Sequence, residues 1–522
     1  MIASESLPAQ FNVASWFVDR NVTEGRGATP AFQYEGRTLT YGQVQELVDR
    51  TGNAVLEIGV EPENRVLMLC LDAPEFIGTF WGAIKIGAVP IPTNTLMRTA
   101  DYLYFLNDSR AKVAVVSAAL LAEVGPALTE ARHLKHVLVA GGAPGPYMSF
   151  EDRVGRASTS LAAAPTSRDD PAYWQYSSGS TGFPKGAVHL HHDMVVCCET
   201  YARQVLGIRP DDRVFSAVKL FFAYGLGATG FIPMSVGAQA VLYPHRPTPE
   251  GVFEVIARFR PTLFFGVPTL YAGMLAVKDA ENRFDTSSLR LCVSAGEALP
   301  DELFTRWRER FGVEIIDGIG TTEIGYIFIS NRPGRARPGS SGVPVPGYEL
   351  AIVDDEGHRV PRGEIGNLRV KGDSTMAYYW NKHDKTKETL FGPWIQTGDK
   401  YYEDAEGYFW YCGRSDDMLK VGGIWVSPFE VEEALIGHPS VLGAAVVGQA
   451  DEDRLIKPKA FVVLQEAAGQ DDPASLTAAL QEHVKARIGV WKYPRWIEFR
   501  ETLPKTPTGK IQRYKLRGER IP

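Results

Sequence analysis

The sequence predicts an α/β protein: a large N-terminal domain of layered α/β subdomains with a β-rich subdomain, followed by a small α+β C-terminal domain. Two observations lead to this fold class. Short apolar, β-rich runs alternate with helical patterns through much of the chain, which is typical of layers with largely parallel sheets. A length of 522 residues also exceeds what one compact core usually supports, so we expect a large domain and a small one.

The α/β layers are predicted from elements that follow one another along the chain. Tyr41–Leu56 has the apolar spacing of a helix. Four apolar runs predict strands, namely Arg65–Cys70, Lys112–Ser117, His136–Val139 and Thr262–Gly266. Because helical patterns separate these runs, we expect the strands to pair in parallel.

The pattern changes between Gly339 and Tyr411, where short strands are punctuated by glycine and proline. Tyr348–Val353 and Gly366–Val370 are the clearest of these predicted strands. This stretch is therefore predicted to form a β-rich subdomain.

A small unit of about a hundred residues follows Arg414. It has two predicted strands, Ala444–Val447 and Ala460–Val463, and a predicted helix over Leu476–Ile488. We expect an N-terminal domain over residues 1–415 that binds the substrates and a C-terminal domain over residues 416–522.

Composition and charge exclude several classes of protein. The chain is 44% hydrophobic and 22% charged, which is the content of an ordinary soluble protein, and its net charge of −7 gives no reason to expect nucleic acid as a partner. Five cysteines, odd in number and without CxxC spacing, favour buried thiols in a reducing cytoplasm over disulfides or zinc. No signal-like N-terminus or membrane-spanning run is visible, so we expect a cytoplasmic protein without a membrane partner.

The most informative motif is the run Ser-Ser-Gly-Ser-Thr-Gly-Phe-Pro-Lys-Gly over residues 177–186. Its glycines let the backbone approach a ligand, its hydroxyls donate hydrogen bonds, and Lys185 supplies a compact positive charge. A Walker-type loop would need Ser or Thr after its lysine, but Gly186 stands there. The run therefore predicts a different kind of polyphosphate loop.

Four further motifs follow in order, namely Asp317–Glu323, Thr397–Asp399, Gly413–Asp417 and Pro504–Lys510. Together with the phosphate loop, they resemble the adenylate-forming superfamily of acyl-CoA and aryl-CoA ligases, adenylation domains and luciferases. The resemblance runs from Leu39 to Ile511. Two segments, Lys219–Gly225 and Asp417–Gly423, look most like the benzoate–CoA ligase branch.

The chemistry of this family requires positive charge at the reaction centre. A carboxylate must attack the α-phosphorus of ATP against mutual anionic repulsion to form an acyl-adenylate. The resemblance implies that Lys510 supplies that charge, that Glu323 binds Mg²⁺ shared with ATP, and that Thr322 contacts phosphate. It also implies that coenzyme A then takes the acyl group, after the small domain turns about Asp416.

The resemblance assigns further residues to the two cosubstrates. Those expected to bind the phosphates are Ser177, Ser178, Gly179, Ser180, Thr181 and Lys185, and those expected around adenine are Ala295, Gly296, Glu297 and Ile319, with Asp317 and Gly318 in the same nucleotide-binding set. Asp399 is expected at the ribose and Arg414 at the ribose or the phosphates. Lys420, Gly422 and Gly423 complete the set, the two glycines lining the route of the pantetheine arm.

The resemblance places an aryl pocket at Ala223, Tyr224, Gly320, Tyr326 and Ile327. Alanine and glycine among aromatic walls make a flat slot rather than an acyl tunnel. For Ile327 alone, ordinary core packing is an equally good interpretation. The benzoate-type pattern has histidine where this chain has Tyr326, which argues against unsubstituted benzoate as the sole substrate. Many acyl-CoA ligases also have histidine at the position of Phe222.

Other interpretations remain open. A stand-alone aryl adenylation enzyme that loads a carrier protein would share these motifs, whereas a nucleotide-binding regulator or kinase would have no need of Lys510 and Glu323. His189, His191 and His192 lack the spacing of common zinc motifs and favour a polar turn. The pattern around Lys510 resembles sites that protein acetyltransferases modify. We expect a monomer or a homodimer that acts on an aromatic carboxylate.

Overall fold

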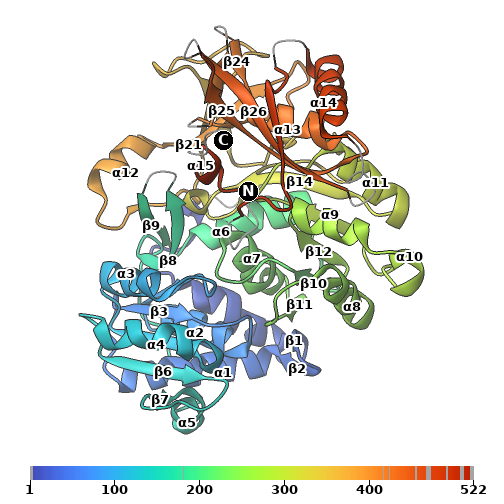
Figure 1. The fold of residues 1–522 in the computed structure, drawn as a ribbon. Coiled ribbons are helices and arrows are strands. Elements are labelled where there is room, and N and C mark those ends of the chain that lie inside the picture. The colour runs from blue at the N-terminus through green and yellow to red at the C-terminus, as the bar shows by residue number, and fades with distance from the viewer. Residues whose placement is uncertain are drawn as a thin grey trace.

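The computed structural model describes residues 4–179, 182–415, 417–421, 424–452, 455–465, 472–489, 492–505 and 511–517. Figure 1 shows a large N-terminal part, blue through yellow to the orange of α12 and β21, with a small C-terminal part, orange-red to red, on top of it. The predicted fold class is confirmed, while the domain boundary at residues 415 and 416 remains a prediction.

The central sheet of the large part contains nine strands among the described residues. In spatial order they are β16 (Val343–Pro344), β15 (Ile327–Ser330), β14 (Ile315–Gly320), β13 (Leu291–Ser294), β12 (Leu263–Gly266), β10 (Arg213–Ser216), β11 (Gln239–Leu242), β1 (Pro30–Tyr34) and β2 (Arg37–Thr40). The strands from β14 to β1 pair in parallel, and β2, β15 and β16 are antiparallel. Every residue of β11, β12 and β13 is buried, because helices cover both faces of a parallel sheet. Here the predicted strand Thr262–Gly266 is confirmed as β12.

A second sheet is entirely parallel, with five strands in the part of the chain that is described. Its order is β4 (Val89–Pro92), β3 (Arg65–Leu69), β5 (Val113–Ser117), β6 (His136–Ala140) and β7 (Met148–Ser149). The three strands predicted from this region are confirmed as β3, β5 and β6. Each predicted run is mainly apolar and contains valine, which suits a strand buried on both faces.

Helix α1 (Tyr41–Glu57), which is the predicted helix, packs against α2 (Pro74–Lys85). Thr40 begins α1 with a capping box, in which its side chain accepts from the Gln43 backbone and the Gln43 side chain accepts from the Thr40 backbone. A Cβ atom at Gly82 would lie 2.9 Å from the Val48 carbonyl oxygen, so glycine is what lets the two helices approach.

Other helices cover the sheets of the large part. They are α3 (Thr99–Ser109), α4 (Leu121–Glu130), α5 (Phe150–Arg156), α6 (Asp193–Cys197), α7 (Ala223–Gly225), α8 (Pro249–Phe259), α9 (Pro268–Ala276), α10 (Ala280–Arg283), α11 (Asp301–Phe311) and α12 (His383–Thr389). No helix among the described residues combines the length and the apolar character needed to cross a bilayer.

Two smaller sheets complete the large part. A hairpin of β8 (Pro171–Gly179) and β9 (Gly182–Leu190) is extended by β19 (Tyr378–Tyr379). The predicted β-rich subdomain is confirmed by β17 (Glu349–Val353), β18 (Gly366–Lys371), β21 (Trp394–Glu403), β20 (Leu390–Phe391) and β22 (Phe409–Arg414).

The small C-terminal part has its own core, which lies between Leu419 and Val484. It contains β23 (Leu419–Val421), β24 (Ile424–Val426), β25 (Val441–Ala450), β26 (Ile456–Leu464) and β27 (Trp496–Phe499), with helices α13 (Pro428–Ile436), α14 (Pro473–Ile488) and α15 (Arg513–Leu516). The two strands and the helix predicted here are confirmed. All five cysteines of the chain are buried and free.

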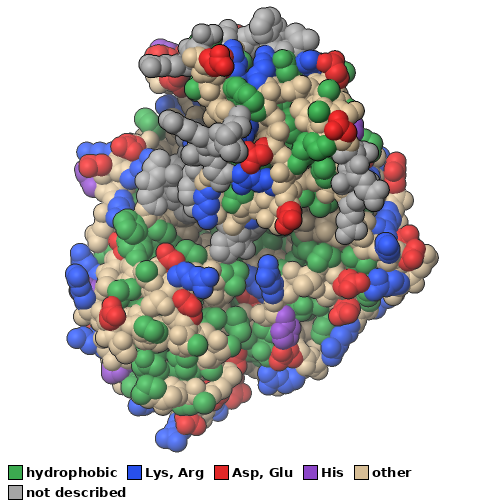
Figure 2. Space-filling model, viewed as in Figure 1, with side chains coloured by type: hydrophobic (Ala, Val, Ile, Leu, Met, Phe, Trp, Pro, Cys, Tyr) green, Lys and Arg blue, Asp and Glu red, His purple; other side chains and the backbone are tan. Residues whose placement is uncertain are grey.

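Figure 2 shows one face of the molecule, on which side chains of both charge signs are interspersed. This distribution fits the modest net charge of the sequence and offers no continuous basic surface on that face.

Candidate active site

The predicted phosphate loop lies at the tip of the β8–β9 hairpin. Ser177 on β8 pairs directly with Lys185 on β9, and the last pair before the tip is Gly179 with Gly182. The pKa of Lys185 is lowered by burial, and the charge of Glu323 opposes that shift. Its ammonium nitrogen lies 4.6 Å from the centre of the Tyr379 ring. Lys185 is therefore held toward the site rather than out into solvent.

Glu323 is part of a short 3-10 turn, Thr322–Ile324, that follows β14. Burial would raise the pKa of its carboxyl, but the hydrogen bond that the Tyr379 hydroxyl donates to Oε1 at 2.7 Å, together with the charge of Lys185, lowers it below the ordinary value. The carboxylate is thus kept ionised. A hard, ionised oxygen ligand suits Mg²⁺, although the described residues contain no group of three His, Cys, Asp or Glu able to enclose a metal. The site therefore fits a Mg²⁺ that takes its remaining ligands from ATP and water.

The predicted adenine residues lie at the carboxyl ends of two adjacent parallel strands. Ser294 at the end of β13 pairs with Asp317 on β14, so Ala295–Glu297 leaves the sheet beside Gly318 and Ile319. Ligands of open α/β sheets bind at this edge. Burial raises the pKa of Asp317 to about 8, so its carboxyl is largely neutral at pH 7.

Two of the predicted glycines are required by close packing. A Cβ atom at Gly318 would lie 2.7 Å from the Ile329 carbonyl oxygen, and one at Gly320 would lie 2.6 Å from the Tyr326 carbonyl oxygen. The register between β14 and β15 shifts between Ile319 and Gly320. Larger residues would push apart the strands that carry the site.

The predicted ribose residues are neighbours in the β-rich subdomain. Asp399 on β21 pairs with Arg414 on β22, and the Arg414 guanidinium lies 3.1 Å from the Asp399 carboxylate. Arg414 also donates to the Thr397 carbonyl at 3.1 Å. Gly398 has a φ of 77°, and a Cβ atom there would lie 2.9 Å from the Arg414 guanidinium.

The predicted aryl residues divide into two layers. Ala223, Tyr224 and Gly320 are partly accessible, and the Tyr224 hydroxyl donates to the Val293 carbonyl at 3.0 Å. Tyr326 and Ile327 are only 2% and 1% exposed and lie behind them in the core. The Tyr224 and Tyr326 rings are 6.3 Å apart, so the buried Tyr326 packs near the ring of Tyr224.

Several predicted residues lie outside the described part of the structure. Ser180, Thr181, Asp416, Gly422, Gly423 and Lys510 are not described, and of Ser178, Gly179 and Lys420 only the backbone is. Their assignments stay predictions.

The structure adds Tyr379, which the sequence did not single out. It occupies β19, next to β9, and contacts both Glu323 and Lys185. A tyrosine in the segment Ala-Tyr-Tyr-Trp carries no local signal for such a role, because both partners are distant in sequence.

The structure also corrects the prediction of a polar turn at the three histidines. His191 and His192 do lie in a turn, but His189 belongs to β9, and all three side chains are buried. Burial lowers the pKa of His191 to about 3, so its ring is neutral.

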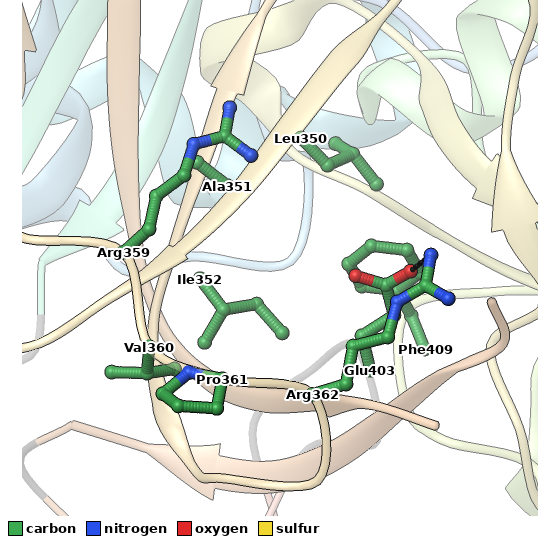
Figure 3. Close-up of a pocket in the computed structure, with 9 residues that line it drawn as sticks. All are labelled: Leu350, Ala351, Ile352, Arg359, Val360, Pro361, Arg362, Glu403 and Phe409. Carbon is green, nitrogen blue, oxygen red and sulfur yellow. Dashed lines mark ion pairs between the residues drawn. The ribbon is translucent and has the colours of Figure 1, made fainter. Parts of the chain in front are cut away.

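Figure 3 shows a cavity elsewhere in the β-rich subdomain, beside the ion pair of Arg362 with Glu403. Its volume of about 40 Å³ is far below that of a typical ligand pocket. The residues that line it are Leu350, Ala351, Ile352, Arg359, Val360, Pro361, Arg362, Glu403 and Phe409, and none of these is a predicted site residue.

Comparisons with known proteins agree with this geometry. The family model for AMP-binding enzymes matches residues 18–380, and the model for the AMP-binding enzyme C-terminal domain matches residues 430–510. A 4-hydroxybenzoate–CoA/benzoate–CoA ligase of Rhodopseudomonas palustris (strain ATCC BAA-98 / CGA009) is 50% identical over 97% of this chain and 94% of its own. A benzoate–CoA ligase of Thauera aromatica is 50% identical over 98% of this chain and 97% of its own.

Solved structures are similar as well. An anthranilate CoA ligase, AuaEII, in complex with anthranoyl-AMP superposes with a TM-score of 0.94 at 45% identity, covering 99% of this chain and 98% of that one. A benzoate CoA ligase from Burkholderia xenovorans LB400 superposes with a TM-score of 0.90 at 44% identity, covering 97% and 100%. The fold and the site together define an adenylate-forming enzyme. Within that class the chain belongs to the AMP-binding enzyme family, in the branch of the benzoate–CoA ligases.

Proposed function

We propose that the protein is an ATP-dependent aryl-CoA ligase. It would convert an aromatic carboxylate and ATP to an aryl-adenylate and pyrophosphate, and then transfer the aryl group to coenzyme A with release of AMP. The observation that carries this proposal is the ionised Glu323 carboxylate beside Lys185 and Tyr379, in a chain half identical to benzoate–CoA ligases over nearly its whole length.

In the first step, we assign Lys185 and the hydroxyls of the β8–β9 tip to the phosphates of ATP. Glu323 would hold Mg²⁺, which when bound offsets phosphate charge as the carboxylate attacks. Asp399 accepts hydrogen bonds from the ribose, and Arg414 keeps that carboxylate in place. Lys510 would bridge the two reacting anions.

The second step would begin when the small domain turns about Asp416. This turn would remove Lys510 and open a route past Gly422 and Gly423 for the pantetheine thiol, which attacks the carbonyl of the adenylate and releases AMP. Charge neutralisation by Lys510 is needed only before the adenylate exists. The two half-reactions are therefore separable.

For the substrate, we propose a benzoate that carries a ring substituent. Small residues such as Ala223 and Gly320 beside the aromatic Tyr224 suit a flat ring. Two relatives of 50% identity are named for 4-hydroxybenzoate together with benzoate and for benzoate alone. Relatives of 35% and 34% identity are named for 3-hydroxybenzoate and anthranilate, so the names support benzoate and its ring-substituted forms as a class. Tyr326 stands where the benzoate-type pattern has histidine, which favours a substituted ring.

We also propose that the enzyme works in the cytoplasm, where ATP and CoA are supplied, as a monomer or a homodimer. A protein acetyltransferase acting on Lys510 would remove the positive charge and stop the first step. Acetylated Lys510 in protein that adenylates at the full rate would contradict this regulation.

The proposal is tested with a panel of benzoate, hydroxybenzoates, aminobenzoates, halobenzoates and short alkyl acids. Pyrophosphate release and AMP release are each measured with and without CoA. We expect aromatic acids to support both products and CoA to be required for turnover. An enzyme that forms adenylate but transfers only to a carrier protein's phosphopantetheine would instead be the stand-alone adenylation enzyme.

The variant Lys510→Ala supplies the matched control. We expect it to lose adenylate formation while still making thioester from supplied aryl-AMP. Equal loss in both half-reactions would make Lys510 a structural residue and would contradict the mechanism.

A further inference from the structure

Both ring nitrogens of the buried His189 face oxygen atoms. Nδ1 lies 2.7 Å from Oδ2 of Asp193, and Nε2 lies 2.6 Å from the backbone carbonyl oxygen of Thr322. Both side chains are fully buried, and the Tyr173 ring stacks on the imidazole at 5.0 Å. A carbonyl oxygen can only accept, so Nε2 must carry a hydrogen and donate it to Thr322.

The second nitrogen then fixes the state of the pair. A neutral imidazole has one N–H, and His189 already uses it toward Thr322. A further proton must therefore lie between Nδ1 and Asp193, because two lone pairs at 2.7 Å would repel each other. The Leu190 backbone also donates to the same carboxylate oxygen at 3.1 Å. Asp193 thus orients the ring, and the ring presents a fixed donor.

That donor is one of three that hold the backbone of the turn that carries Glu323. Three consecutive carbonyls of the turn each accept a hydrogen bond from outside it: Thr322 from His189 at 2.6 Å, Glu323 from the Met376 backbone at 2.7 Å, and Ile324 from the Ser374 hydroxyl at 2.8 Å. Two of these donors come from the segment just before β19. His189 alone of the three comes from β9. Within the turn, the Gly325 backbone also donates to the Thr322 carbonyl, at 3.3 Å.

The origin on β9 matters because β9 also carries Lys185. Residues four positions apart on a strand point to the same face of a sheet, so Lys185 and His189 face the same side of the hairpin. Lys185 acts on the charge of Glu323, and His189 holds the backbone of the preceding residue. One strand therefore sets the distance between the phosphate loop and the expected metal ligand.

We propose that His189, oriented by Asp193, is a positioning residue that fixes the Glu323 carboxylate relative to Lys185 for the adenylation step. This inference rests on the proposed function, since it takes Glu323 as the Mg²⁺ ligand. His189 touches neither ATP nor metal and acts through the Thr322 carbonyl. Without its donor, the Thr322 carbonyl would keep only the 3.3 Å bond from Gly325 within the turn and would lose the bond from β9.

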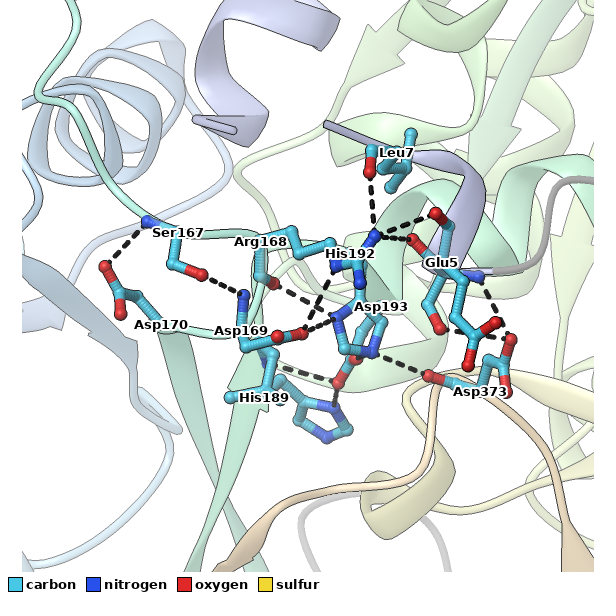
Figure 4. Close-up of polar contacts among 12 residues, drawn as sticks. Glu5, Leu7, Ser167, Arg168, Asp169, Asp170, His189, His192, Asp193 and Asp373 are labelled. Atoms are coloured by element: carbon cyan, nitrogen blue, oxygen red, sulfur yellow. Dashed lines mark hydrogen bonds and ion pairs between the residues drawn. The ribbon is translucent and has the colours of Figure 1, made fainter. Parts of the chain in front are cut away.

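The other two histidines of the segment serve as an internal contrast. The His192 ring faces the carbonyls of Arg168 at 3.0 Å and Asp373 at 2.9 Å, as Figure 4 shows. Arg168 in turn donates to carbonyls of the N-terminal segment, including that of Leu7 at 2.8 Å. His191 accepts from the Val13 backbone at 3.1 Å. Neither ring bonds to the 322–324 turn among the described contacts.

The experiment compares two substitutions of His189 whose side-chain amide nitrogens reach different positions of the ring. Glutamine can place its amide nitrogen near the position of Nε2 and donate to Thr322, whereas asparagine reaches only as far as Nδ1. The stability control is His191→Ala, which removes a buried ring from the same segment without touching the turn. Each variant is studied as the full chain by thermal melting, by calorimetric binding of α,β-methylene-ATP as a function of Mg²⁺, and in both half-reactions.

We expect His189→Asn to need about 10 to 100 times more Mg²⁺ for nucleotide binding, as is typical when a partner that orients a metal ligand is lost. Adenylation should fall, thioester formation from supplied aryl-AMP should persist, and His189→Gln should recover most of the loss. The inference is overturned if glutamine is as poor as asparagine, or if His191→Ala, at a similar loss of melting temperature, has the same Mg²⁺ requirement. Nucleotide binding needs no aromatic acid. A failure of this inference can therefore be distinguished from a failure of the proposed substrate or acceptor, which the substrate panel tests.

Discussion

The variant Tyr379→Phe removes one hydroxyl from the candidate site and leaves its ring in place. Tyr379 is 4% exposed, and its hydroxyl donates to Glu323 at 2.7 Å. The ring also lies 4.6 Å from the Lys185 ammonium, a contact that phenylalanine retains. The substitution therefore tests the hydrogen bond to Glu323 apart from the packing around it.

The size of the effect follows from the charge of the acceptor. A hydrogen bond to a charged group contributes about 1.5 to 3 kcal/mol, and the Glu323 side chain is partly accessible, so we expect about 1.5 to 2 kcal/mol in the free energy of unfolding. As a metal-ligand orientation effect, the same loss corresponds to about tenfold or more in Mg²⁺ affinity.

The direction of the Glu323 pKa shift predicts how the destabilisation by Tyr379→Phe depends on pH. The pKa of Glu323 is lowered in the folded protein, so its contribution is fully present above the ordinary value of 4.5 and is lost as the pH falls through the folded value. The destabilisation by Tyr379→Phe should thus be full at neutral pH and should shrink below about pH 4.5. Urea unfolding at neutral and at acid pH measures this difference.

The neighbouring residue provides the control. Tyr378 is on the same strand but 37% exposed, and Tyr378→Phe should change unfolding by less than about 0.5 kcal/mol. If Tyr379→Phe destabilises the protein equally at both pH values, the hydrogen bond to an ionised Glu323 is not the source of its effect, and the reasoning is refuted.

Three further predictions concern packing, pH and the second half-reaction. Gly227→Ala should destabilise the protein by about 1 to 3 kcal/mol, because its Cβ would lie 1.9 Å from a ring carbon of Tyr326. It should also alter KM for the aryl acid. An unchanged urea midpoint would contradict this prediction. Burial and the charge of Asp301 raise the pKa of Glu433 to about 7. The free energy of unfolding of the wild type should therefore decrease as the pH rises from 4.5 to 7, and Glu433→Gln should not show this decrease. Parallel pH profiles of the two proteins would contradict this prediction. Gly423→Leu should keep pyrophosphate release and lose thioester formation in single-turnover assays, with a melting curve as control; parallel loss of both would leave Gly423 as a turn glycine.

The sequence was informative wherever function depends on a local pattern. The strands Arg65–Cys70 and Thr262–Gly266 and the helix over Leu476–Ile488 follow from apolar periodicity, and the structure has them within a few residues. The motif around Glu323 could be recognised because it resembles a family motif within one short segment, and its role stays a prediction. The pairing of Asp399 with Arg414 was not foreseen, since two separate motifs meet only when β21 pairs with β22.

Contacts between distant segments could not be predicted from local pattern. Tyr379 reaches Glu323 across 56 residues, and His189 reaches Thr322 across 133. A histidine in a polar-looking sequence gives no sign of which remote carbonyl it meets, and the turn predicted for His189 was wrong because β9 extends to Leu190. Burial and an acceptor at each ring nitrogen, rather than sequence spacing, define the role of this residue.

The contacts that join the small C-terminal part to α11 differ in kind from those that hold the Glu323 turn. At α11, Glu433 accepts from the Asp301 backbone at 3.5 Å, and Arg487 lies 3.7 Å from the Asp301 carboxylate, which are long and polar contacts. The Glu323 turn is instead held by short hydrogen bonds of 2.6 to 2.8 Å, buried or partly buried. Polar contacts of this kind between domains are compatible with relative motion, whereas short buried ones resist it. The proposed turn of the small domain between half-reactions, with Glu323 held in place through the first, would use this distribution of contacts.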